Sequence, residues 1–365
     1  MIPVCEPLLT GKELEYVTDC LKTNWISSAG KYIAEFEKGF AAYCGSKHGI
    51  TTTSGTTALH LALAALGIGK GDDVIIPTLT MAACAFSVIY TGAKPVLVDS
   101  EPRTMNLDPE QVARRITPRT RAIIAVHLYG HPADMDPLLQ IAFRRGLSVI
   151  EDAAEAHGAL YRGREVGGLG HVAAFSFFGN KIITTGEGGM VTTRDEDLGR
   201  KVRILRGQGM DPDRRYWFPV VGYNYRMTNI QAAIGLAQVE QFAQHRDGRR
   251  QVAGWYDRHL SGLADFLRLP VEESWARHAF WTYTVLLRDG SGVTRDEIMA
   301  RLAEQGIETR PAFYPMHLMP PYAEPEGRYP VAESLGRRGI SLPMHSLLTE
   351  GDVAYIADCI RSCRP

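Results

Sequence analysis

The sequence predicts an α/β protein with a mainly parallel sheet of seven strands, flanked by helices, and a smaller α+β C-terminal domain. From about residue 47, short apolar runs alternate with helix-like segments at regular spacing. Parallel strands need a crossover of a dozen or more residues, so this alternation indicates repeated strand–helix–strand units with helices on both faces. The length of 365 residues also suits two domains.

The elements can be assigned in order along the chain. The strands of the large sheet are expected at 48–53, 73–77, 94–99, 121–130, 147–158, 172–178 and 189–193. Helices between the first five are expected at 56–67, 80–92, 108–116 and 134–146. A long helical pattern over 228–260 connects a large domain, 1–240, to a small domain, 241–365. We expect a helix over 11–22 to pack on that small domain.

Composition argues against several classes of partner. Forty Lys and Arg residues against 41 Asp and Glu leave a net charge of −1, so neither nucleic acid nor an anionic membrane is an expected partner. No apolar window is long enough to span a bilayer, and residues 1–15 lack the pattern of a signal peptide. The six cysteines are scattered without a C-x-x-C pair, which predicts incidental reduced thiols in a cytoplasmic protein and no metal site.

Ligands of parallel sheets bind beyond the carboxyl ends of the strands, so the residues that follow each apolar run are the candidates for a site. Ser54, Gly55 and Thr56 follow the first run and begin a helix. Free backbone N–H groups and the helix dipole make that position suitable for a phosphate. A plain helix cap is the competing interpretation.

Two acids, Glu151 and Asp152, follow the apolar stretch "LSVI" that begins the fifth run, and Lys181 lies 29 residues beyond Asp152 among small and apolar residues. Glu151 is expected to serve the structure. Asp152 and Lys181, with the phosphate position, suit pyridoxal phosphate (PLP), which needs an anion at its pyridine nitrogen and an amine at its aldehyde. A desolvated lysine has a lowered pKa and can form a Schiff base.

Four segments then identify a family by resemblance. "TSGTTALHLAL", "VIEDAAEAHGA", "FSFFGNKIITTGEGGMVTT" and "GYNYRMTNIQAAIGLAQ" resemble, in order and spacing, the DegT/DnrJ/EryC1/StrS-type sugar-nucleotide aminotransferases of PLP fold type I. The resemblance implies PLP, with its pyridoxamine form during turnover, and a homodimer whose subunits share active sites. It assigns the Schiff base to Lys181, the pyridine nitrogen to Asp152 and the ring hydroxyl to Glu155. The phosphate contacts it implies are Ser54, Gly55, Thr56, Ser176 and, from the neighbouring subunit, Asn224.

One position departs from the family pattern. After "IPTLT" the family usually carries an aromatic residue that stacks on the cofactor ring, and this chain has Met81. A thioether can contact a ring favourably, by roughly 0.3–1.5 kcal/mol, so the substitution is compatible with cofactor binding.

Three further segments, 23–37, 207–227 and 310–322, most resemble the members that form GDP-perosamine. Such a member converts GDP-4-keto-6-deoxy-D-mannose, with L-glutamate as amino donor. Arg226 is the expected partner of the glutamate carboxylate. The substrate-binding residues expected from these segments are Trp25, Ser27, Ser28, Arg214, Arg215, Arg226, Arg310, Tyr314 and His317.

Several alternatives stay open at this point. The same fold could aminate another keto-sugar nucleotide, linked to UDP or dTDP, at C3 or C4. A dehydratase branch carries histidine in place of the lysine, and Lys181 argues against it. A non-catalytic PLP-binding regulator is the alternative from another class. A nicotinamide dehydrogenase is disfavoured because no G-x-G-x-x-G follows the first strand.

Overall fold

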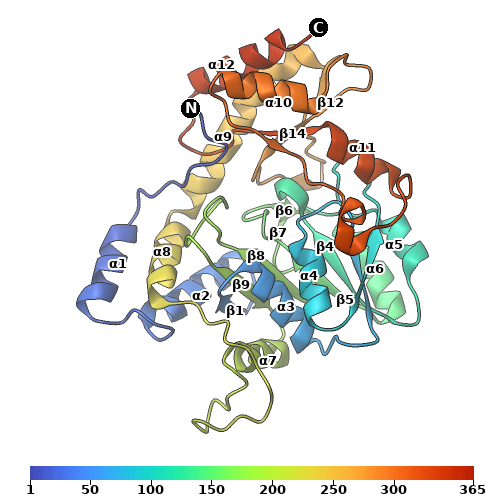
Figure 1. Cartoon of the computed structure of the whole chain (residues 1–365). Coiled ribbons are helices and arrows are strands. Elements are labelled where there is room, and N and C mark those ends of the chain that lie inside the picture. The colour runs from blue at the N-terminus through green and yellow to red at the C-terminus, as the bar shows by residue number, and fades with distance from the viewer.

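A computed structural model describes residues 1–365 of the protein (Figure 1). The α-helices are α1 (Glu13–Lys22), α2 (Lys31–Tyr43), α3 (Gly55–Ala65), α4 (Ala83–Tyr90), α5 (Pro109–Arg115), α6 (Met135–Arg145), α7 (Glu196–Arg206), α8 (Asn229–Glu240), α9 (Phe242–Leu260), α10 (Arg295–Glu304), α11 (Pro330–Arg338) and α12 (Glu350–Ser362). None of them has the length and apolar character needed to cross a membrane.

The strands form one large sheet and two small ones. They are β1 (His48–Thr52), β2 (Asp73–Pro77), β3 (Lys94–Val98), β4 (Thr120–Val126), β5 (Ser148–Asp152), β6 (Leu160–Tyr161), β7 (Arg164–Glu165), β8 (Val172–Ser176), β9 (Gly189–Thr193), β10 (Leu267–Arg268), β11 (Ala276–Arg277), β12 (Tyr283–Leu287), β13 (Arg310–Pro311) and β14 (Gly339–Leu342). Short 3-10 turns lie at η1 (Leu128–Gly130), η2 (Ser261–Leu263), η3 (Met316–Leu318) and η4 (Pro320–Tyr322).

The large sheet confirms the predicted fold class. Its seven strands run in the order β1-β9-β8-β5-β4-β2-β3 and correspond to the seven predicted segments. Neighbours pair in parallel from β8 to β3, whereas β9 is antiparallel to both β1 and β8. Every residue of β2, β8 and β9 is buried, as expected for a sheet covered on both faces.

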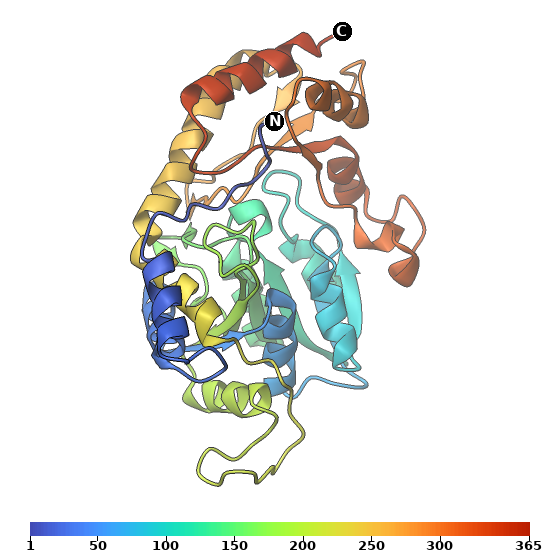
Figure 2. The same cartoon turned by 60° about the vertical axis from the view of Figure 1, so that its left-hand side comes forward.

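The long helical pattern over 228–260, which suits one helix or two, forms two helices. α8 and α9 are separated at Gln241, and α9 leads from the large sheet towards the C-terminal domain (Figure 1). That domain contains the antiparallel sheet β10-β12-β14-β13, and α9 and α12 pack side by side along it (Figure 2). It has a hydrophobic core of 23 buried residues, separate from the 70-residue core around the large sheet. A domain boundary at residue 240 stays a prediction, because the larger core also includes Leu286 and Leu335.

The N-terminal helix does not lie where we expected it. α1 packs against α8 beside the large sheet, and Tyr16 Oη donates a hydrogen bond of 2.8 Å to Glu240. The predicted packing on the small domain is therefore wrong for this helix. The residues before it make that contact instead: Ile2 N donates to Gly306 O at 2.7 Å, and Val4 O accepts from Met344 N at 2.9 Å.

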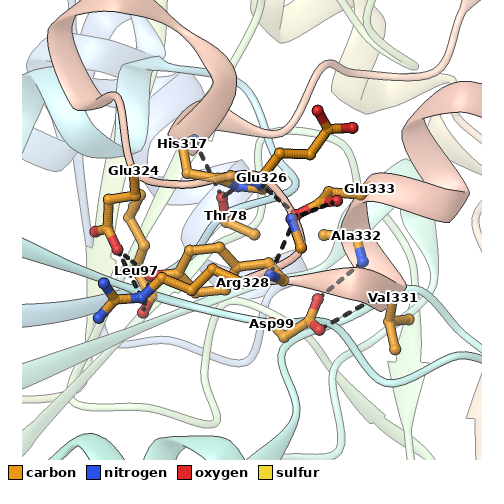
Figure 3. A network of polar contacts seen from close by, with 12 residues as sticks. Thr78, Leu97, Asp99, His317, Glu324, Glu326, Arg328, Val331, Ala332 and Glu333 are labelled. Carbon is orange, nitrogen blue, oxygen red and sulfur yellow. Dashed lines mark hydrogen bonds and ion pairs between the residues drawn. The ribbon is translucent and has the colours of Figure 1, made fainter.

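A buried polar network links the end of β2 and β3 to α11 (Figure 3). The His317 ring is fully buried, with Nδ1 2.8 Å from Thr78 Oγ1 and Nε2 donating to Glu333 at 3.0 Å. The Asp99 carboxylate accepts from the first free amides of α11, those of Val331 and Ala332. Both ring nitrogens of His317 are thus occupied, which corrects its expected role in substrate binding: it is a structural residue between segments.

Candidate active site

A cavity of about 420 Å³ lies at the carboxyl ends of the large-sheet strands, where the C-terminal domain faces them. Its volume is typical of a small-molecule site. The structure brings together in its wall nine of the residues selected from the sequence: Ser54, Gly55, Thr56, Met81, Asp152, Glu155, Ser176, Lys181 and Arg310.

One end of the cavity is built as an anion cradle at the start of α3. Ser54 caps the helix by accepting from Thr57 N at 3.2 Å. The amides of Gly55 and Thr56 belong to the first turn, where a helix supplies no acceptor, so they are available to a ligand. A Cβ on Gly55 would lie 2.8 Å from Ser176 Cβ. The cap interpretation and the phosphate interpretation are therefore compatible, because Ser54 caps the helix and also lines the cavity.

Lys181 lies on the loop between β8 and β9, and the glycines around it let that loop approach the cradle. A Cβ on Gly189 would lie 2.3 Å from Ser54 O, so only glycine fits beside the α3 start. Desolvation lowers the pKa of the Lys181 amine, and the charges of Glu155 and Asp152 oppose that shift. A lysine with a lowered pKa is a better nucleophile and base near neutral pH than an exposed one.

Two carboxylates face this lysine region from the end of β5. Asp152 Oδ1 accepts from Ala154 N at 3.1 Å, and Oδ2 accepts from the Cys84 thiol at 2.9 Å. Glu155 accepts from Tyr129 N at 2.7 Å, and burial raises its pKa against the opposing charge of Lys181. Asp152 and Glu155 both raise the pKa of the Lys181 amine, so the charge of each acid affects the protonation of the lysine.

Glu151 confirms the structural role expected for it. Its carboxylate is fully buried and accepts three backbone hydrogen bonds, each of 2.8 Å, from Gly167, Leu169 and Gly170. It also pairs with His127 at 3.2 Å. With these partners the charge is satisfied on the side of the strand that faces away from the cavity.

An aromatic wall next to Lys181 was missed at the level of sequence. Trp281, Phe313 and Tyr129 stack on one another with centroid separations of 5.4 to 6.4 Å. The Lys181 amine lies 3.8 Å from the Trp281 ring centroid, and Trp281 Nε1 donates to Asn180 O at 2.8 Å. Tyr129 follows the end of β4, but the predicted strand over 121–130 extended past it, so the strand-end rule did not select it. Trp281 precedes β12 and carries no such signal.

The other expected substrate residues lie outside the cavity of this chain. Trp25, Ser27, Ser28 and Arg226 gather where α1 meets α2 and α8 begins: Arg226 Nε donates to Ser28 Oγ at 3.2 Å, and Trp25 O accepts from Asn229 at 2.7 Å. Arg214, Arg215 and Asn224 lie on the loop between α7 and α8, which projects from the molecule in both views (Figures 1 and 2). Tyr314 is half exposed and packs under the Arg295 guanidinium.

The residues present fit pyridoxal phosphate. Free helix amides and hydroxyls stand at one end of the cavity for a phosphate, and the Asp152 carboxylate stands in the wall for a protonated ring nitrogen. Lys181 lines the same cavity. Gly55 and Gly189 have no side chains, and a Cβ at either position would collide with the residues around the start of α3. The residues of the cavity thus match the phosphate, the ring nitrogen and the aldehyde of the cofactor.

Comparison with known proteins agrees with this geometry. The model of the DegT/DnrJ/EryC1/StrS aminotransferase family matches residues 7–361. A GDP-perosamine synthase of Caulobacter vibrioides is 58% identical over 353 residues, covering 96% of this chain and 95% of the relative. A GDP-perosamine synthase of Escherichia coli O157:H7 is 48% identical, covering 98% of this chain and 97% of the relative.

Solved structures share the whole fold. DesV of S. venezuelae has a TM-score of 0.89 and 40% identity, with 96% of this chain and 94% of that chain covered. Spr1654 of Streptococcus pneumoniae, in its PLP form, has a TM-score of 0.94 and 27% identity, with 99% and 98% covered. This chain belongs to the DegT/DnrJ/EryC1/StrS aminotransferase family and has the fold of the PLP-dependent transaminases.

Proposed function

We propose that this protein transfers the amino group of L-glutamate to C4 of GDP-4-keto-6-deoxy-D-mannose and so forms GDP-perosamine, with PLP as cofactor. The observation that carries the reaction type is the Lys181 amine, grouped with Asp152 and Glu155 in a cavity that ends in an anion cradle. The choice of sugar nucleotide is supported by two relatives named GDP-perosamine synthase, at 58% and 48% identity over nearly the whole chain.

Each side chain has a separate task in this proposal. The start of α3 and Ser176 hold the phosphate, Asp152 pairs with the pyridine nitrogen, and Glu155 contacts the ring hydroxyl. Met81 lies in the cavity wall with half of its surface exposed, where its thioether can cover one face of the ring. When bound, PLP supplies an aldehyde that takes up the amino group and a ring that accepts the electron pair left by a broken C–H bond.

Lys181 moves the protons. Because desolvation lowers the pKa of its amine, the unprotonated form, which can take a proton from a substrate carbon, is more populated than in an exposed lysine. The same nitrogen, once protonated, returns that proton at a neighbouring carbon. The face of the Trp281 ring, 3.8 Å away, stabilises the protonated amine by a cation–π contact and keeps it beside the cavity.

We also propose a homodimer in which the loop between α7 and α8 completes the partner's site. Asn224, Arg214 and Arg215 lie on this loop and not in the cavity of their own chain. The loop exposes Tyr216, Trp217, Phe218 and Val221, an apolar set typical of a protein interface. Six free cysteines support the expected cytoplasmic location.

The direct test offers the holoenzyme L-glutamate with GDP-, UDP- and dTDP-linked 4-keto-6-deoxy sugars, and identifies products by mass and NMR. Amination of the GDP sugar at C4 is the expected result. Lys181→Ala should abolish steady-state turnover, whereas Lys201→Ala, a change at an exposed lysine of α7, should leave it intact. A preference for a UDP or dTDP sugar would overturn the sugar assignment. Bound cofactor whose spectrum does not respond to glutamate would point to the regulatory alternative.

A further inference from the structure

We propose that Cys84 is a positioning residue of this active site: its thiol holds the Asp152 carboxylate in the orientation that the cofactor's pyridine nitrogen requires. The inference deepens the proposed function and rests on it for the identity of the cofactor. Cysteine 84 lies in the first turn of α4, and Asp152 ends β5, so the contact joins two separate elements of the large domain. Cys84 Sγ and Asp152 Oδ2 are 2.9 Å apart.

Both partners are removed from water. Cys84 is fully buried and Asp152 is 6% exposed. Burial raises the pKa of the Cys84 thiol well above its ordinary value, and the Asp152 charge raises it further, so the sulfur carries its proton. The thiol is therefore the hydrogen-bond donor and the carboxylate the acceptor. The other hydrogen-bond contact of the Cys84 sulfur is with Thr80 Oγ1, at 3.9 Å.

The carboxylate depends on this donor for its orientation. The χ2 torsion of aspartate is broad, so the plane of the carboxylate is fixed by its contacts and not by an intrinsic rotamer. Each carboxylate oxygen of Asp152 accepts one hydrogen bond from the protein: Oδ1 from the backbone N–H of Ala154 and Oδ2 from the Cys84 thiol. Without Cys84, Oδ2 has no donor from the protein, and the carboxylate is free to turn about the remaining contact.

The chain supplies a matched control. Cys44 is 2% exposed, and burial also raises the pKa of its thiol well above the ordinary value. It packs in the same large hydrophobic core but does not line the active-site cavity. A change at Cys44 therefore reproduces the loss of a buried thiol without touching Asp152.

The experiment compares Cys84→Ala, Cys84→Ser and Cys44→Ala with the wild-type holoenzyme. We expect Cys84→Ala to lower kcat about tenfold, the value of one hydrogen bond to a charged group, with KM for glutamate within about twofold. The affinity of the apoenzyme for PLP should fall by a similar factor. A less well oriented Asp152 carboxylate stabilises the protonated ring nitrogen less. The lysine–cofactor linkage then becomes more basic, so the pH midpoint of the visible absorbance should rise. Cys84→Ser keeps a donor and should restore all three values; Cys44→Ala should leave them unchanged.

Three results would overturn the inference: an unchanged kcat and midpoint in Cys84→Ala, the same changes in Cys44→Ala, or a serine variant as impaired as the alanine variant. Thermal unfolding of each apoenzyme checks the fold, and Cys84→Val, which fills the site without a donor, replaces the alanine variant should that variant not fold. Cofactor affinity and absorbance do not depend on the sugar. A wild-type enzyme that aminates another nucleotide sugar would refute the proposed substrate and leave this comparison decisive for Cys84.

Discussion

At the scale of single residues, burial and two neighbouring acids have opposite effects on the pKa of the Lys181 amine. Desolvation lowers its pKa, and Glu155 is the largest of the influences that raise it. Glu155 is itself fully enclosed, since it is 4% exposed and accepts the Tyr129 amide. Burial therefore determines the direction of the pKa shift of this lysine, and Glu155 is the main group that limits it.

Replacing Glu155 by glutamine tests this balance. Glu155→Gln removes the largest opposing charge, so the pKa of the Lys181 amine should fall further. Only the unprotonated amine reacts with an aldehyde, so the rate at which the apoenzyme recombines with PLP should reach half its maximum at a lower pH than in the wild type. Stopped-flow absorbance over a pH series measures that midpoint.

Glu165 is a suitable control for the Glu155 variant. Burial raises the pKa of Glu165 to about 7, and the charges that oppose this shift are those of Arg246 and Arg277. Lys181 is not among them. Glu165→Gln should therefore leave the recombination midpoint where it is, and a midpoint that moves in this variant, or stays fixed in Glu155→Gln, would contradict the assigned pairing.

At the scale of elements, the start of α3 combines a helix cap with close contacts to β8 and β9 that leave no room for a side chain. Ser54 and Thr57 form a reciprocal capping box, which fixes where the helix begins. Gly55 follows the cap directly and faces Ser176 on β8, while Gly189 on β9 lies under Ser54 O. The register pairs Ser176 with Gly189 and Thr52 with Gly189, so three strands and one helix meet at this point.

Gly55→Ala should weaken PLP binding without unfolding the protein. The new Cβ would lie 2.8 Å from Ser176 Cβ and 3.3 Å from its hydroxyl oxygen, so the cradle must shift. Overpacking of this kind costs roughly 1–3 kcal/mol, and the same range in binding free energy is a loss of affinity of about fivefold to more than a hundredfold. Titration of the apoenzyme with PLP, followed by absorbance, measures the change.

A glycine of α9 provides the opposite case. A Cβ on Gly254 would meet no atom within 4 Å, and the residue lies inside a helix. Gly254→Ala should therefore raise the free energy of unfolding by about 0.5–1 kcal/mol and leave PLP affinity unchanged. Equal losses of affinity in the two variants would show that the effect of Gly55→Ala is not steric.

Sequence periodicity located most elements because local patterns determine them. All seven strands of the large sheet coincide with apolar runs, and residues at or after the ends of five of them, β1, β2, β4, β5 and β8, line the cavity. Contacts that depend on tertiary packing were not accessible in the same way. Cys84 was expected to be incidental, and its contact with Asp152 depends on how the fold brings α4 and the end of β5 together. His317 was expected in the substrate pocket, but Thr78 and Glu333 bind both of its ring nitrogens. The missed Trp281 lies 100 residues after Lys181 in the sequence, just before β12, and carries no local motif.

At the scale of the whole molecule, the expected site residues fall into two groups. Lys181, Asp152 and the α3 start share one cavity, whereas Asn224 and Arg226 lie beyond α7, at the projecting loop and its junction with α8. Asn224 is held there by a bridge to Gly207. Closed twofold symmetry uses the same patch on both subunits, so one loop on each chain can complete two sites at once.

Subunit complementation tests this arrangement. Lys181→Ala removes the reacting amine, and Asn224→Asp sets a negative charge against the phosphate of the partner's cofactor; each homodimer should be inactive. A heterodimer purified with two different tags has one site with both changes and one with neither. It should recover about half of the wild-type activity per dimer, since one of its two sites is native. If Asn224 served only its own chain, each site of the heterodimer would carry one lesion, and activity would stay absent. Analytical ultracentrifugation of the wild-type protein supplies the remaining check, because a monomer would rule out any shared site.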